Sequence, residues 1–127
     1  MTFVQMGDFD VLGHLDIVQR YAFETGKVYN LEDYKYHIYD ILKIIISRGK
    51  GIEINTSGLL SNNLLFPKIE ILQMYKDLKG EILTVGSDAH SRNRVGEKIS
   101  YVYDVLKNIG FKYVFTYDNR KTNGILL

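Results

Sequence analysis

The sequence contains no cysteine and only one proline among its 127 residues. Without cysteine, disulfide bridges and thiolate metal sites are excluded, so a metal ion would need histidine, carboxylate or backbone oxygen ligands. Long apolar runs are also missing, because none approaches the roughly 18 to 20 residues that cross a bilayer. The start MTFVQMGDFD lacks the basic and then apolar order of a signal peptide. We therefore expect a cytoplasmic protein with no membrane partner.

An excess of charge of one sign is lacking too. Sixteen Lys and Arg residues face fifteen Asp and Glu residues, which leaves a formal net charge of +1. This balance provides no bulk attraction for nucleic acid, so any phosphate-binding charge must be local. The hydrophobic content of 46% and the length fit one globular unit over residues 1–127.

Three similar phrases are present, each a short apolar run that ends in polar residues and precedes a segment with helical spacing. They are FDVLGHLD at 9–16, GIEINTSGL at 51–59 and EILTVGSDAH at 81–90. A further run, FKYVFTYD at 111–118, is typical of a last strand with no helix after it. Strands that alternate with helices at this spacing predict an α/β fold of parallel β/α units.

The segments between these phrases carry helix signals. Asn30 as a cap, with Asp33 in the first turn, predicts the start of a helix whose apolar residues recur on one face. Pro67 fits the first turn of a second helix. A third helix is expected through 99–109, with its stop at Gly110.

Four residues that could do chemistry fall near the carboxyl ends of the predicted strands, where parallel sheets place their sites: His14, Glu53, Asp88 and His90. Asp88 and His90 would point the same way if their strand extends that far, and could then hold one ion or one substrate. Plainer interpretations are a turn cap for Asp88, polar surface for His90 and a structural role for His14. Glu53 within an apolar strand needs a cation, a metal ion or a water-filled lumen, unless it faces solvent on an edge strand.

Three arginines follow the histidines closely, namely Arg20, Arg92 and Arg94. The guanidinium fork matches phosphate oxygens, which makes these residues candidates for binding a substrate phosphate. Solvated surface charge is the alternative. His37 lies within a predicted helix and away from any strand end, so we expect it at the surface or in helix packing.

The motifs DVLGHLDIVQRY, GIEINTSGL and LTVGSDAHS, in this order, resemble the carboxyl-terminal half of histidinol-phosphatases of the PHP superfamily. The resemblance implies the carboxyl-terminal part of a distorted (β/α)7 TIM-like barrel with two or three divalent metal ions, such as Zn, Mn or Fe. It also implies that His14, Asp88 and His90 are metal ligands and that Arg20 binds phosphate. Asp16 is then either a proton donor to the leaving oxygen or a partner of a ligand histidine.

Two departures from the family pattern shape the functional prediction. The family's upstream H-x-H pair is not found, and residues 60–62 are Leu-Ser-Asn where relatives often have a phosphate-binding arginine, a charge that Arg92 or Arg94 would replace. The sequence thus predicts a partial PHP domain from a metal-dependent phosphatase that acts on L-histidinol phosphate and has little activity alone. Its exposed strand edges would favour self-association. Alternatives are a PHP phosphoesterase for nucleotides, or a non-catalytic remnant or interaction module whose strands pair with another chain.

Overall fold

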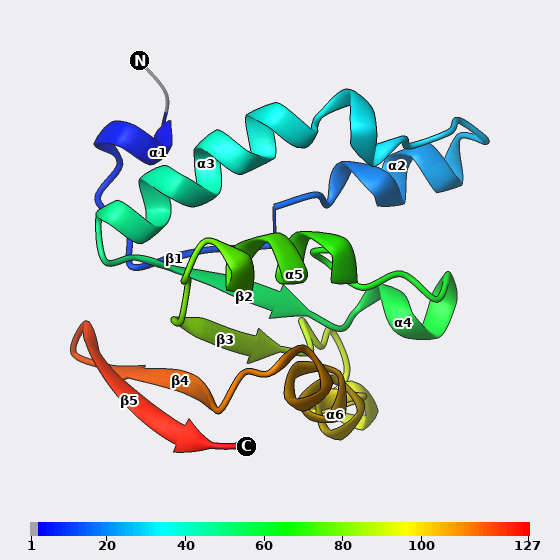
Figure 1. The fold of residues 1–127 in the computed structure, drawn as a ribbon. Coiled ribbons are helices and arrows are strands. Elements are labelled where there is room, and N and C mark those ends of the chain that lie inside the picture. The colour runs from blue at the N-terminus through cyan, green and yellow to red at the C-terminus, as the bar shows by residue number, and fades with distance from the viewer. Residues whose placement is uncertain (1–2) are drawn as a thin grey trace.

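Three parallel strands form the centre of the computed structural model, which describes residues 3–127 (Figure 1). In spatial order the strands are β1 (Val11–Leu12), β2 (Gly51–Asn55) and β3 (Leu83–Gly86). The register pairs Leu12 with Ile52 and Glu53 with Thr84. Each predicted phrase contributes one strand, so the prediction of parallel β/α units is confirmed for this part of the chain.

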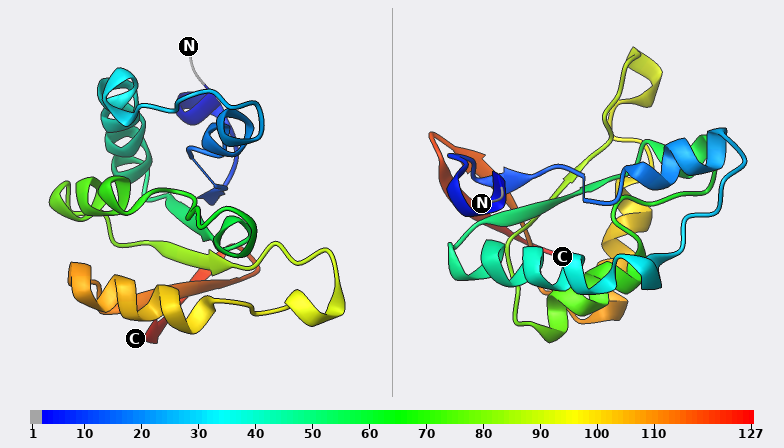
Figure 2. Two further views of the ribbon diagram at one scale, coloured as in Figure 1. Left: turned by 90° about the vertical axis from the view of Figure 1, so that its right-hand side faces the viewer. Right: turned by 90° about the horizontal axis from the view of Figure 1, so that it is seen from above.

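Helix α1 (Phe3–Met6) precedes β1, and helical segments follow each of the three strands. These are α2 (Val18–Glu24), η1 (Leu31–Asp33) and α3 (Lys35–Ser47) after β1, α4 (Gly58–Ser61) and α5 (Ile69–Asp77) after β2, and η2 (Arg92–Arg94) and α6 (Ile99–Ile109) after β3. Figure 2 shows α3, α5 and α6 on one side of the strands, while the loop that contains η2 projects from the other side. Within residues 3–127, no helix has both the length and the apolar character that crossing a membrane requires.

The helix signals are confirmed in part. Asn30 caps the short η1 by accepting a hydrogen bond from the Glu32 N–H at 3.3 Å, but the long helix that it was predicted to start, α3, begins only at Lys35. The predicted stop of α6 at Gly110 is confirmed, with a left-handed φ of 99°. Pro67, predicted in the first turn of α5, instead lies ahead of it, so that prediction is wrong. The extended Lys68 is the cap residue, and its N–H donates to the buried Asp16 carboxylate at 3.1 Å, which fixes the helix start at Ile69.

The apolar core lies between the parallel strands and the helices. Ile52 and Ile54 of β2 are fully buried there, together with Leu42 of α3 and Leu72 of α5. Burying each such side chain contributes roughly 1.5–3 kcal/mol. Because strand side chains alternate, Glu53 points to the opposite face of the sheet, the face that these helices leave uncovered.

An antiparallel hairpin completes the fold, formed by β4 (Tyr113–Asp118) and β5 (Lys121–Leu126). The sequence predicted β4 but not β5, and β4 is not a further parallel strand, although it lies next to β3. The turn residues Asn119 and Arg120 have φ values of 47° and 66°. Two-residue turns of this kind require a positive φ at both positions and join antiparallel strands, which explains the difference.

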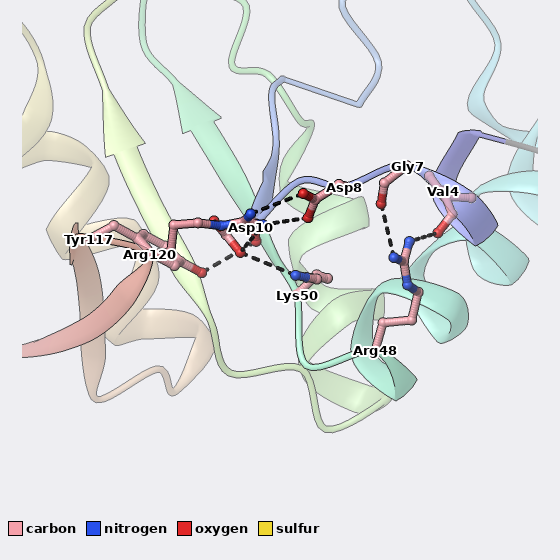
Figure 3. Close-up of polar contacts among 8 residues, drawn as sticks. All are labelled: Val4, Gly7, Asp8, Asp10, Arg48, Lys50, Tyr117 and Arg120. Atoms are coloured by element: carbon pink, nitrogen blue, oxygen red, sulfur yellow. Dashed lines mark hydrogen bonds and ion pairs between the residues drawn. The ribbon is translucent and has the colours of Figure 1, made fainter.

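The hairpin turn is tied to the amino ends of the parallel strands (Figure 3). The Arg120 guanidinium donates to Asp8 at 2.6 Å and to Asp10 at 2.7 Å, and Asp10 also pairs with Lys50 at 3.1 Å. The Tyr117 hydroxyl donates to the Asp10 carbonyl at 3.3 Å. Asp10 precedes β1 and Lys50 precedes β2, so this cluster, called the Arg120 cluster below, lies opposite the carboxyl ends of the strands.

Candidate functional site

Glu53 lies between the ends of the two outer parallel strands. A Cβ atom at Gly86 would come within 2.7 Å of Glu53 Oε1, and one at Gly13 within 3.4 Å of Oε2. Burial raises the pKa of the Glu53 carboxyl; the charge of His14 opposes this shift and that of Asp88 adds to it. The carboxylate therefore interacts with the segments after β1 and after β3.

The predicted pair after β3 comes together through a turn and not through strand alternation. The strand ends at Gly86, and Asp88 takes a left-handed φ of 48°, so the condition that β3 extends to Asp88 and His90 is not met. His90 Nε2 nevertheless lies 3.6 Å from Asp88 Oδ1. Both side chains are exposed, as is His14, which also has a positive φ of 48°. These groups are accessible to a ligand from solvent.

A cleft of about 230 Å³ lies at this end of the strands. Its lining includes four of the predicted site residues, from three separate segments: Arg20, Asp88, His90 and Arg94. Arg92, in contrast, is exposed and does not line the cleft. The other residues that line the cleft are Glu24, Ser57 and Asn62.

Three hollows are larger than the cleft, with volumes of about 710, 470 and 360 Å³. The first runs between η1 and α5, the second between α2 and the start of α5, and the third beside the start of β4. None of the three is lined by a histidine or an arginine. The cleft is smaller, but it gathers an imidazole, carboxylates and guanidinium groups. We therefore take the cleft as the candidate site, since chemistry depends on such convergence more than on volume.

Hydrogen bonds hold both cleft arginines against the segment after β2. Arg20 Nη2 donates to Ser57 Oγ at 2.6 Å, and its guanidinium lies 5.1 Å from the centre of the buried Phe66 ring. Arg94 Nη2 donates to the Ser57 carbonyl at 3.1 Å, and Arg94 Nε donates to Glu97 at 3.3 Å. Both guanidinium groups are thus oriented before any ligand binds.

Asp16 lies outside the cleft. Its side chain is 1% exposed and its Oδ2 accepts hydrogen bonds from Gln19 Nε2 at 3.0 Å and from the Lys68 N–H at 3.1 Å. Burial raises the pKa of Asp16 to about 6. Because the carboxylate is engaged at the start of α5, these contacts describe a role in positioning the backbone and give no contact with a ligand histidine.

Comparison with known proteins supplies the decisive observation. The chain is 37% identical over 109 residues to a probable histidinol-phosphatase of Thermotoga maritima, and 33% identical over 107 residues to one of Clostridium acetobutylicum. The chain is homologous to histidinol-phosphatases. A histidinol-phosphatase of Lactococcus lactis subsp. lactis is 31% identical over 121 residues. No model of a known protein family matches the sequence.

The histidinol-phosphatase relationship extends to three dimensions. The crystal structure of the Lactococcus lactis histidinol phosphate phosphatase, in complex with zinc, L-histidinol and phosphate, superimposes on 95% of the chain with a TM-score of 0.78 at 26% identity. The chain covers 46% of that structure and 42–43% of the curated relatives. The resemblance found in the sequence motifs is confirmed, and it applies to less than half the length of a histidinol-phosphatase.

The donor types at the cleft match those of zinc sites in proteins, because zinc binds imidazole nitrogen and carboxylate oxygen. Asp88 and His90 are close to each other, and His14 and Asp88 are both near enough to Glu53 to influence its pKa. Within residues 3–127, however, no three His, Asp or Glu residues are grouped closely enough to hold a metal ion. The ligand roles of His14, Asp88 and His90 stay predictions.

Several cleft residues of this histidinol-phosphatase relative were not singled out from the sequence. Ser57 lies in the polar stretch NTSG, in which the buried Asn55 is the last residue of β2 and Ser57 follows two residues later. Polar residues at the end of an apolar strand were the signal that identified His14 and Asp88. The same signal is present at the end of β2. Glu24 and Asn62 had no comparable signal, since their place in the cleft depends on tertiary packing.

Proposed function

We propose that the chain is part of a metal-dependent phosphatase that hydrolyses L-histidinol phosphate to L-histidinol and phosphate. The convergence of Arg20, Arg94, Asp88 and His90 in one cleft carries this proposal. The homologous Lactococcus lactis structure, which holds zinc, L-histidinol and phosphate, supports it. The substrate is a small phosphate monoester, which suits a cleft of about 230 Å³ and a chain with a formal net charge of only +1.

In this proposal Arg20 and Arg94 bind the substrate phosphate. A guanidinium offers five N–H donors, of which Arg20 uses one on Ser57 and Arg94 uses one each on Ser57 and Glu97. The remaining donors are free to contact phosphoryl oxygens and to stabilise charge that develops on them. Arg94 thus replaces the arginine that relatives often carry in the segment that corresponds to residues 60–62, and Arg92 is left as a surface residue.

His14, Asp88 and His90 would hold divalent metal in the complete enzyme, with Glu53 as an additional carboxylate beside them. When bound, such an ion supplies a water of lowered pKa and a Lewis acid for the phosphoryl oxygens. Zinc is the ion in the homologous structure, which supports a divalent metal; Mn, Fe and a cluster of two or three ions stay predictions. Further ligands would come from the part of the longer relatives that the chain does not match.

The same reasoning leads us to propose that the parallel strands are part of a (β/α)7 barrel whose lumen contains Glu53. The chain spans 42–43% of its curated relatives, so we expect the isolated chain to turn over L-histidinol phosphate far more slowly than a full-length relative. Strand β1 (Val11–Leu12) is half-buried and lies at the edge of the three-stranded sheet, and this edge would then be open to self-association.

The test is to titrate the chain with zinc and then with inorganic phosphate by calorimetry, and to measure phosphate release from L-histidinol phosphate and from a nucleotide. We expect the chain to bind inorganic phosphate, and Arg20→Ala to weaken this binding about tenfold or more, since a charge-assisted contact is lost. Arg92→Ala is the matched control and should bind normally. Absence of phosphate binding both with and without zinc, or preferential release from the nucleotide, would contradict the proposed function.

A further inference from the structure

We infer that Ser57 is a positioning residue that aims Arg20 into the cleft and aligns it with Arg94, so that both guanidinium groups can bind one phosphate. The inference rests on the proposed function, because it concerns how this cleft binds an anion. Ser57 contacts both arginines through different atoms: its Oγ accepts from Arg20 at 2.6 Å and its carbonyl accepts from Arg94 at 3.1 Å. One residue therefore connects α2 to η2.

The direction of the hydrogen bonds makes the Ser57 hydroxyl specific for this task. Its Oγ donates its single proton to Asn55 Oδ1 at 2.6 Å, and the Ser57 N–H donates to the same oxygen at 3.0 Å. With its proton committed to Asn55, the hydroxyl can only accept from Arg20, and a guanidinium can only donate. In the hydrogen-bonded series Asn55–Ser57–Arg20, each contact thus has only one possible donor and one possible acceptor.

The base of this chain of hydrogen bonds is rigid. Asn55 is the last residue of β2 and is 1% exposed, and its backbone N–H and carbonyl are both bonded to Phe66, at 2.6 and 3.2 Å. The Phe66 ring in turn lies under the Arg20 guanidinium. Arg20 is therefore held by the face of the Phe66 ring and by the Ser57 hydroxyl. Phe66 and Ser57 are both hydrogen-bonded to Asn55, at the end of β2.

Orientation matters in this cleft because its formal charges cancel. Arg20 and Arg94 are balanced by the carboxylates of Glu24 and Asp88. Net charge alone therefore does not draw an anion into the cleft, and phosphate binding depends on guanidinium N–H groups that are already directed at it. A released Arg20 could turn toward a carboxylate, and the affinity for phosphate would fall.

Substitution of Ser57 with phosphate binding as the readout tests this inference. In zinc-loaded chain, we expect Ser57→Ala to weaken the binding of inorganic phosphate about tenfold by calorimetry, because one charge-assisted hydrogen bond orients Arg20. Ser57→Cys keeps a side chain of similar size but is a poor acceptor, so it should show a similar loss. Ser57→Thr retains the hydroxyl and should bind inorganic phosphate with nearly the affinity of the unmodified chain.

A double-mutant cycle separates positioning from a general structural role. Ser57→Ala should have no further effect on phosphate affinity in an Arg20→Ala background, because Ser57 acts through Arg20. It should keep its full effect in an Arg94→Ala background, since alanine retains the backbone carbonyl that Arg94 uses. The urea midpoint and the zinc affinity of each variant should stay near those of the unmodified chain.

The outcomes distinguish the two proposals. If Ser57→Ala and Ser57→Cys bind phosphate as tightly as the unmodified chain while Arg20→Ala does not, the positioning role is wrong and the proposed function stands. Equal effects of Ser57→Ala with and without Arg20 also overturn the positioning role. If the unmodified chain binds no phosphate either with or without zinc, the proposed function fails and this inference fails with it.

Discussion

Arg120 Nε lies 2.7 Å from Oδ2 of Asp10, a residue 110 positions earlier in the chain. The same guanidinium holds Asp8 through two further contacts, at 2.6 and 3.0 Å. These contacts fasten the β4–β5 turn to the segment before β1. Hydrogen bonds from Arg120 are the largest cause that holds the pKa of both carboxyls below the ordinary value of 3.8.

Removing this guanidinium should destabilise the fold in a way that depends on salt and pH. We expect Arg120→Ala to lower the urea midpoint at neutral pH, and the difference from the unmodified chain should shrink at about 1 M salt because the ion pairs are exposed. Depressed carboxyl pKa values stabilise the fold above pH 3.8 and lose that effect as the pH falls through the folded-state values. Arg92→Ala is the control, and an equal effect of both substitutions would contradict the role of the Arg120 cluster.

Asp16 should make stability depend on pH in the opposite direction. Its pKa is about 6 in the folded chain against an ordinary 3.8, so its stabilising contribution is fully present below pH 3.8 and is lost as the pH rises through 6. A pKa raised from 3.8 to about 6 corresponds to about 3 kcal/mol of unfolding free energy at most. Asp16→Asn keeps an acceptor for the Lys68 N–H and removes the charge. We expect it to flatten the dependence of unfolding free energy on pH between about 4 and 7 in metal-free buffer.

Urea titrations of Asp16→Asn and the unmodified chain at several pH values measure this effect. Equal slopes of unfolding free energy against pH would show that Asp16 does not titrate in this range.

Gly80 and Gly49 should respond differently to alanine. A Cβ atom at Gly80 would overlap the ring of Tyr75, which is 1% exposed, whereas at Gly49 it would meet nothing within 4 Å but would be strained by a φ of +64°. We expect Gly80→Ala to cost roughly 1–3 kcal/mol and Gly49→Ala about 1 kcal/mol in unfolding free energy. Chemical denaturation measures both, and a smaller loss at Gly80 than at Gly49 would contradict the packing described for Tyr75.

The three histidines should separate by their effect on zinc binding. We expect His90→Ala and His14→Ala each to weaken zinc affinity at least tenfold, because each removes a proposed ligand. His37→Ala is the matched control, since His37 is exposed on α3 and far along the chain from the strand ends. Calorimetric titration with zinc decides the matter, and equal affinities for all three variants would remove the basis for a metal site at the cleft.

The sequence identified the parallel strands and the residues at their ends because buried strands are short apolar runs with polar residues after them. Asp88 and His90 were found for this reason, although β3 ends before it reaches them. The positive φ of Asp88 depends on a turn that the apolar pattern does not encode. The location of Asp88 and His90 was thus predictable from the sequence, and their conformation was not.

Other features depend on tertiary contacts that one sequence does not show. Arg92 and Arg94 are two residues apart with the same chemistry, and only the fold turns Arg94 into the cleft. Strand β5 is exposed along its whole length, so it lacks the apolar alternation that reveals a half-buried strand. Proline is common in the first turn of a helix, so the sequence predicted that α5 includes Pro67. In the structure α5 begins at Ile69, because Lys68 is its cap residue and donates its N–H to Asp16.

The Arg120 cluster and the cleft occupy opposite ends of the same strands, and this separation has a practical consequence for engineering. Substitutions around Asp8, Asp10 and Lys50 could be screened for tolerance to heat or acid without changing any group that we propose to bind phosphate. Conversely, the loops that carry Ser57 and Arg94 could be varied to select for binding of other phosphorylated molecules, while the Arg120 cluster is kept unchanged.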